Sequence, residues 1–309
     1  MRSVRGIPAF VVLLVLPTWL PAQDQRDPKK DPEQIGTRDV SKGINLYSIP
    51  KEIALGKQLA AEVKRSAKVV DDPVISEYVN RLAQNLVRNS DAKFPVITEV
   101  IQGEQVNALS LPGGYFFVNT GLILAAETEA ELAGAMAHEI AHIAARHGTR
   151  QATKGEIANI ATIPLIFMGG WAGYGARQAA GILVPVTFLS FTRAFESEAD
   201  MLGLQYMYKA GYDPVGLVDI FEKISALDKR KPGRVAKLFS DHPPTGDRVT
   251  TVQKYIQTLL KEQPQYVVTT SEFNQVKARL MALENQRQMD PLDPNRPRLR
   301  KAGDPKLAD

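Results

Sequence analysis

Two histidines four residues apart, with an acid directly after the first, are the side chains of this 309-residue chain best placed to do chemistry. They form the run His138-Glu139-Ile140-Ala141-His142, inside a stretch that is predicted to be helical. At about 3.6 residues per turn, positions 138 and 142 lie about 40° apart around the helix axis, so both imidazoles can bind one metal ion. Glu139 is turned by about 100°, which places its carboxylate beside the ion without making it a ligand. The pattern predicts a catalytic metal site.

A second acidic cluster can complete this site. A catalytic zinc ion takes three protein ligands and leaves one position for water, and Glu196 lies near the start of another predicted helix. Glu196 and Asp200 share one helix face, so Glu196 can bind the metal while Asp200 accepts a hydrogen bond from the far nitrogen of a ligating histidine. A solvated acidic helix start is the alternative. Glu198 lies on another face and is expected at the surface.

The remaining histidines and the composition limit the kinds of functional site that the chain can form. The chain has four histidines and no cysteine, which excludes disulfides, thiolate metal sites and cysteine nucleophiles. His147 lies five residues after His142, about 500° around a continuous helix, so we expect a packing or helix-end role and not a metal ligand. The formal net charge is only +4, which is too small an excess to indicate a nucleic-acid partner.

Hydrophobic periodicity and capping residues predict the elements that position these side chains. Asp72 followed by Pro73 is typical of a helix start, and glutamates early in the metal-site helix favour the positive end of its dipole. The predicted helices span 51–69, 73–89, 127–148, 194–210, 214–228, 246–261 and 272–288, and the predicted short strands lie at 96–101 and within 105–118.

One predicted strand is a candidate binding site for substrate. An extended peptide could pair with an exposed sheet edge through backbone hydrogen bonds. Alternatively, the segment is an ordinary buried strand. Its residues are Asn107, Ala108, Leu109, Ser110 and Leu111, and a turn at Pro112-Gly113-Gly114 is expected to end it.

The chain begins with a predicted secretory signal. Arg2 and Arg5 precede the apolar residues 7–16, and residues 20–22 offer a cleavage site, so residues 1–22 are expected to be removed on export. A retained membrane anchor is the alternative, although the apolar run is shorter than the roughly 20 residues that span a bilayer.

Three further segments differ from the rest in composition. Residues 23–48 are polar and proline-containing and are predicted to form a linker, and residues 289–309 are predicted to be a disordered charged tail. Residues 157–192 carry Arg177 as their single charge and are interrupted by glycine and proline. Buried helices or a flap that contacts a membrane surface are favoured there over two transmembrane spans.

The order and spacing of these motifs resemble the zinc metalloprotease family of the CAAX prenyl proteases and the bacterial HtpX and BepA proteins, within the gluzincin group. The matching pieces lie between about residues 50 and 260. They are Asn107–Gly114, Thr120–Leu122, Glu131–Ala133, His138–His142, Arg146-His147, Glu196 with Ala199-Asp200, and His242-Pro243-Pro244 with Arg248.

The resemblance implies an α+β, mainly helical fold with a small β-sheet beside the metal-site helix. The metallopeptidase domain is expected over 49–262, followed by a C-terminal helix within 263–288. One Zn²⁺ per chain would be bound by His138, His142 and Glu196.

The resemblance also implies the roles of the reacting side chains. Glu139 is expected to take a proton from a zinc-activated water and deliver it to the leaving amine. His242 and Arg248 are candidates for stabilising the oxyanion or for gating the zinc. His242 could instead occupy the fourth metal position in a resting state.

The favoured function is therefore a periplasmic zinc endopeptidase that cleaves unfolded or misassembled envelope proteins. A chaperone-like scaffold with a latched, rarely catalytic zinc site is one alternative. An integral membrane protease, in which 157–192 crosses the bilayer, is another.

Overall fold

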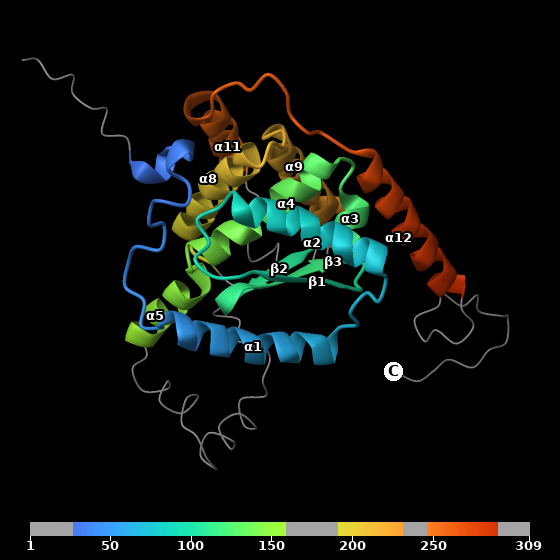
Figure 1. Ribbon diagram of the computed structural model, residues 1–309, viewed down its shortest axis with the longest axis horizontal. Helices are drawn as coiled ribbons and strands as arrows, with labels where there is room; N and C mark the ends of the chain where they lie inside the picture. Colours follow the sequence, from blue (N-terminus) through green and yellow to red (C-terminus); the bar gives the residue numbers. More distant parts are fainter. Residues whose placement is uncertain (1–26, 159–190, 231–245, 290–309) are drawn as a thin grey trace, which may run out of the picture.

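The computed structural model describes residues 27–158, 191–230 and 246–289. The predicted signal at 1–22, nearly all of the apolar segment 157–192, His242 and the predicted tail after Met289 lie outside these ranges. The described chain is mostly helical, with one small sheet (Figure 1). This confirms the expected α+β, mainly helical fold.

The sheet has three strands in the order β1-β3-β2. β1 (Ile97–Ile101) runs parallel to β3 (Tyr115–Asn119), and β2 (Ala108–Leu111) is antiparallel to β3. The predicted strand region 105–118 is therefore two strands, because Gly113 and Gly114 adopt φ values of 74° and 88° and reverse the chain.

Helices cover both faces of the sheet (Figure 1). α1 (Ile49–Ser66) packs on the face that carries Phe117, and α2 (Pro73–Arg88) contacts β1 and shares an apolar cluster with Phe116 and Val118 of the other face. Alternating strand residues thus contribute to two separate apolar clusters. Further helices outside the centre include α3 (Thr120–Ala125), α11 (Gly246–Leu259) and α12 (Ser271–Met289).

α4 (Glu129–Ala144) is the central helix, and all of its residues are buried. It contacts the sheet, α8 (Arg193–Lys209) and α9 (Val215–Arg230). Thr128 caps it by accepting a hydrogen bond from the N–H of Glu131 at 3.2 Å. Its alanine-rich sequence presents little side-chain bulk, so neighbouring helices can approach its backbone closely.

The predicted helix 127–148 is broken near its end, which corrects the prediction of a single continuous helix. α4 ends at Ala144, and α5 (His147–Ala158) begins after Arg146, a residue with a φ of 56°. The Arg146 side chain is held by Glu52 and by the Tyr47 carbonyl, each at 2.6 Å. These long-range contacts stabilise a left-handed conformation that arginine seldom adopts.

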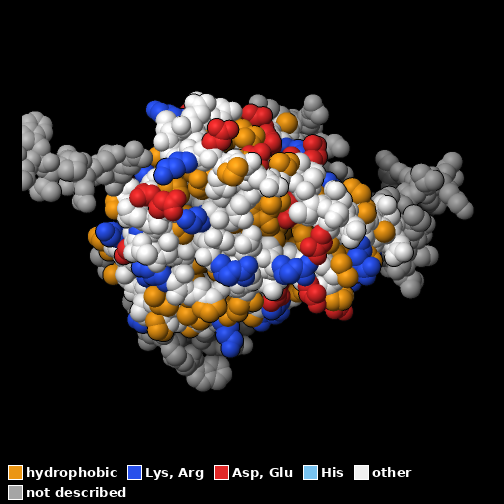
Figure 2. Space-filling model, turned by 45° about the horizontal axis from the view of Figure 1, so that its top comes forward, with side chains coloured by type: hydrophobic (Ala, Val, Ile, Leu, Met, Phe, Trp, Pro, Cys, Tyr) orange, Lys and Arg blue, Asp and Glu red, His pale blue; other side chains and the backbone are white. Residues whose placement is uncertain are grey.

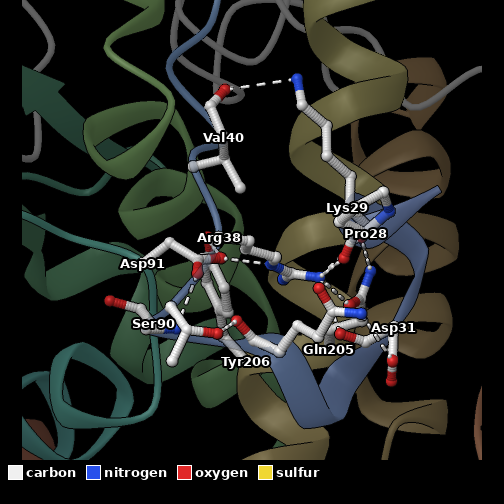
Figure 3. Close-up of polar contacts among 12 residues, drawn as sticks. Pro28, Lys29, Asp31, Arg38, Val40, Ser90, Asp91, Gln205 and Tyr206 are labelled. Carbon is white, nitrogen blue, oxygen red and sulfur yellow. Dashed lines mark hydrogen bonds and ion pairs between the residues drawn. The ribbon is translucent and has the colours of Figure 1, made fainter.

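The described part of the predicted linker, residues 27–48, packs on α8. Figure 3 shows the Arg38 guanidinium between Asp91 and the segment's own carbonyl groups. Its Nε donates to Asp91 at 2.9 Å and its Nη1 to Gln205 of α8 at 2.8 Å. The Arg38 and Asp91 side chains are 1% and 0% exposed. The prediction of a polar linker did not anticipate this buried anchor, which joins segments far apart in the sequence.

The described surface carries both signs of charge. Figure 2 shows Lys and Arg side chains interspersed with Asp and Glu over the face in view. Large hydrophobic side chains exposed around the start of α1 include Ile44, Leu46 and Ile53. Among the described residues, no helix combines the length and the apolar character needed to cross a bilayer.

Candidate metal centre

Three side chains from two helices meet in the interior. His138 and His142 of α4 have their Nε2 atoms 3.1 Å apart. The Glu196 carboxylate of α8 has one oxygen 3.5 Å from His138 Nε2 and the other 3.6 Å from His142 Nε2. We call these two imidazole nitrogens and this carboxylate the metal-ligand triangle.

The triangle has the dimensions of a zinc site. Ligand atoms placed about 2.0–2.1 Å from a tetrahedral zinc ion are separated by about 3.3 Å. The three separations of 3.1, 3.5 and 3.6 Å bracket this value. Among the described residues, this is the group of His, Asp and Glu side chains that could hold a metal ion. The donors therefore fit the metal expected from the sequence.

Close contact between the two helix backbones makes the triangle possible. A Cβ atom on Gly203 of α8 would lie 2.9 Å from the His138 nitrogen and 3.0 Å from the Ala137 carbonyl carbon. Only glycine permits this approach. This close approach of the two helices lets the Glu196 side chain reach α4 from the first turn of α8, where Thr192 caps the helix.

Asp200 and Arg248 lie behind the ligands. Asp200 Oδ1 is 3.0 Å from His138 Nδ1. Arg248 of α11 donates to Asp200 from Nε at 2.8 Å and from Nη2 at 2.7 Å, and its Nη1 is 3.1 Å from Glu196. Burial alone would raise the pKa of Asp200, but the Arg248 guanidinium and then His138 hold that pKa below its usual value. Asp200 is thus an ionised acceptor for His138.

The histidine contacts also shift pKa values. Burial alone would lower the pKa of His138, but its contacts with the Asp200 and Glu196 carboxylates raise that pKa to about 9. Burial alone would likewise lower the pKa of Arg248, yet Asp200 and Glu196 raise it. The Asp200 and Glu196 carboxylates therefore outweigh burial in their effect on the pKa values of His138 and Arg248.

Glu139 lies beside the triangle on α4 and is 2% exposed. Its Oε2 accepts a hydrogen bond of 2.6 Å from the Ser110 hydroxyl of β2. The edge strand of the sheet and the metal-site helix are therefore joined at the side chain expected to act as the base.

The predicted substrate segment has features of both alternatives. Asn107 precedes β2, and β2 lies at an edge of the sheet, yet Ala108, Ser110 and Leu111 are buried. A small cleft runs from this strand to the metal site. It is lined by Glu52, Ser110, Leu111, Pro112, His142, Ile143, Arg146, Gly148 and Phe191.

The direction of the His147 side chain departs from the prediction, whereas its packing role and its place outside the metal-ligand triangle agree with it. Because the chain bends at Arg146, the His147 ring returns to His142, and the two Nδ1 atoms are 3.0 Å apart. The calculation of about 500° assumed an unbroken helix. His147 is fully buried and faces the back of His142, away from the metal-ligand triangle. It is therefore not placed as a fourth ligand.

Glu198 is also not the surface residue that was predicted. Its carboxylate lies 3.1 Å from His147 Nε2 and also contacts Lys29 and Arg150. Burial alone would raise the pKa of Glu198, but His147 and Lys29 lower it to about 2. Burial lowers the pKa of His147 to about 4. The motif Arg146-His147 signalled that His147 had a role, but nothing in the sequence signalled its partners.

Comparison with known proteins places the chain among peptidases. A model described as peptidase family M48 matches residues 73–256. The beta-barrel assembly-enhancing protease of Escherichia coli strain K12 is 27% identical over 250 residues, which is 78% of this chain and 50% of the relative. A Vibrio cholerae protein assigned to the same kind of protease is 30% identical over 249 residues, with the same two coverages. The metalloprotease LoiP of E. coli strain K12 is 28% identical over 202 residues, 64% of this chain and 78% of the relative.

The chain spans about half the length of the beta-barrel assembly-enhancing proteases that it matches. The family model, in contrast, covers more than half of this chain and contains both metal-site helices, α4 and α8, and Arg248. The predicted resemblance to zinc metalloproteases is thereby confirmed, and the chain belongs to peptidase family M48.

Proposed function

We propose that this chain is a zinc endopeptidase that cleaves unfolded or misassembled envelope proteins in the bacterial periplasm. The observation that carries the proposal is the metal-ligand triangle of His138, His142 and Glu196 with Glu139 beside it. The names of the relatives support the substrate class, and the predicted signal at 1–22 supports export.

The chain's own residues supply most of the chemistry. One zinc ion in the triangle would polarise a scissile carbonyl and lower the pKa of a water molecule. Glu139 takes a proton from the attacking water and delivers it to the leaving amine. Asp200 fixes the orientation of His138, and Arg248, already within 3.1 Å of Glu196, is the described candidate donor for the oxyanion. His242 is the second candidate and lies outside the described residues.

The edge strand β2 is the proposed binding site for extended substrate. Alternate backbone groups of an edge strand point away from its partner and can pair with a peptide. Ser110 lies in this strand and contacts Glu139, so a peptide paired along residues 107–111 would pass beside the base. Backbone pairing selects unfolded chains and not particular side chains.

The experiment is substitution of Glu139 by Gln in the full chain. The variant should retain one zinc ion per chain by elemental analysis and lose casein cleavage by at least about a hundredfold, because an amide cannot accept the proton. Glu77→Gln, at an exposed position of α2, is the matched control and should cleave like the wild type. A clean Glu139→Gln preparation that still cleaves casein would refute the assigned base.

The same variant separates the proposed protease from a binding scaffold. If Glu139→Gln rescued an envelope-defective strain as well as the wild type, chaperone-like binding would be the function. Contact of 157–192 with a membrane surface is a separate proposal. Release by a carbonate wash would exclude an integral membrane protease.

A further inference from the structure

His142 has a second hydrogen-bonded neighbour behind the metal-ligand triangle, and this neighbour is also a histidine. His142 directs Nε2 to the triangle and Nδ1 to Nδ1 of His147, at 3.0 Å. His147 in turn directs Nε2 to Glu198 Oε2, at 3.1 Å. Glu198 ends the series in contact with Lys29 of the N-terminal segment and Arg150 of α5.

The positions of the protons follow from this order. A metal-bound imidazole uses the lone pair of Nε2, so the proton of neutral His142 is on Nδ1 and this atom donates. His147 Nδ1 must then accept, which leaves the His147 proton on Nε2. That N–H donates to a carboxylate oxygen of Glu198, which also contacts Lys29 and Arg150. Every donor in the series therefore meets an acceptor.

Aromatic packing fixes the ring that connects the two ends. The His147 ring stacks on Phe195 of α8 with centroids 4.4 Å apart and planes 19° apart. His142 stacks on Phe191 in the same way, at 4.2 Å and 21°. The His147 side chain is completely buried. Neither ring can turn without losing these contacts, so the hydrogen-bond directions are fixed.

We propose that His147 and Glu198 are positioning residues for the metal ligand His142, holding it in the tautomer and orientation that binds zinc. The proposal rests on the proposed metal site and extends it. His138 is held by Asp200 directly, whereas His142 is held by a carboxylate one imidazole further away. Lys29 and Arg150 both contact that distant carboxylate, so the N-terminal segment places a cation behind the metal site.

His147→Phe is the direct test, because phenylalanine keeps the ring shape and the stack on Phe195 but has no nitrogen. Zinc affinity, measured by competition with a chromogenic chelator, should fall about 10–100-fold. The visible absorption of the Co²⁺-substituted protein should change as well. His147→Asn places an amide oxygen near the lost Nδ1 and should recover part of the affinity, and Glu198→Gln should lose less than His147→Phe.

Thr153→Val is the matched control. Thr153 lies in α5, as His147 does, and is fully buried. Its hydroxyl accepts a hydrogen bond from the Leu46 N–H at 3.0 Å and takes no part in the series from His142 to Glu198. The Thr153→Val substitution should lower the stability of the protein to urea without changing its zinc affinity. A folded His147→Phe variant with wild-type zinc affinity and an unchanged Co²⁺ spectrum would overturn the proposal.

A measurement on the wild type covers the case in which the variants fail to fold. ¹⁵N-histidine NMR of the zinc-loaded protein should show the His142 proton on Nδ1 and the His147 proton on Nε2. A proton on His147 Nδ1 would overturn the proposal. A wild-type chain that binds no zinc would instead refute the proposed function, so the two failures can be distinguished.

Discussion

The Asp200 carboxylate contacts both the proposed metal ligand His138 and Arg248. It lies 3.0 Å from His138 Nδ1 and accepts two hydrogen bonds from the Arg248 guanidinium. This bidentate geometry is one that lysine cannot reproduce. Since Asp200 is only 2% exposed, its charge is balanced by these two residues and not by solvent. Asp200 thus positions His138 and holds the Arg248 guanidinium beside Glu196.

We expect Asp200→Asn to lower zinc affinity about 10–100-fold, because the amide is a weaker acceptor for the His138 N–H and a poorer partner for Arg248. Zinc affinity by chelator competition measures the effect. Asp219→Asn, at an exposed position of α9, is the control and should bind zinc like the wild type. Equal affinities of the two variants would show that Asp200 does not support the ligand.

The packing of α8 on α4 decides whether the distant carboxylate reaches the two histidines. The helical spacing of His138 and His142 could be predicted from the sequence, because it depends only on the geometry of one helix. The bend at Arg146 could not, since the residue in the left-handed conformation is an arginine and contacts with Glu52 and Tyr47 stabilise it. The predicted direction of the His147 side chain is therefore wrong.

We expect Gly203→Ala to destabilise the protein by about 1–3 kcal/mol, because the added methyl group would meet the α4 backbone and push the helices apart. The same separation should weaken zinc binding, since the Glu196 carboxylate would move away from the imidazoles. Urea unfolding and chelator competition test the two effects.

Gly246→Ala is the control for this substitution. Among the described residues, a Cβ atom on Gly246 would meet no atom within 4 Å, so stability and zinc affinity should stay near wild-type values. If Gly203→Ala behaved like Gly246→Ala, the close approach of α4 and α8 would not be a constraint on the site.

Over the whole molecule, the N-terminal segment is a part of the fold that local sequence patterns did not reveal. Residues 27–48 have the composition of a linker, and their docking depends on Arg38 finding Asp91 and Gln205, far along the chain. Such pairings leave no periodicity to detect. Helix bounds within α2 or α11, by contrast, depend on local caps and periodicity and lie close to the predicted bounds.

We expect Arg38→Met to destabilise the protein by about 3–5 kcal/mol, because it leaves the Asp91 carboxylate buried without its cation. Denaturation in urea measures this loss. Lys93→Met removes an exposed ion pair with Asp39, with side chains 44% and 43% exposed, and should cost at most about 1 kcal/mol. The double variant Arg38→Met with Asp91→Asn should lose less stability than Arg38→Met alone. Equal losses of stability for Arg38→Met and Lys93→Met would show that the buried ion pair between Arg38 and Asp91 does not anchor the segment.

The contact between Lys29 and Glu198 joins residues 169 positions apart. A ribosome or a translocation channel delivers a polypeptide from one end to the other, so Lys29 emerges long before its partner exists. The segment can dock only after α8 has emerged and folded. Until the segment docks, Glu198 lacks the Lys29 ammonium, which is one of the cations that it contacts in the folded chain. Docking of this segment therefore joins residues made early to a helix made much later.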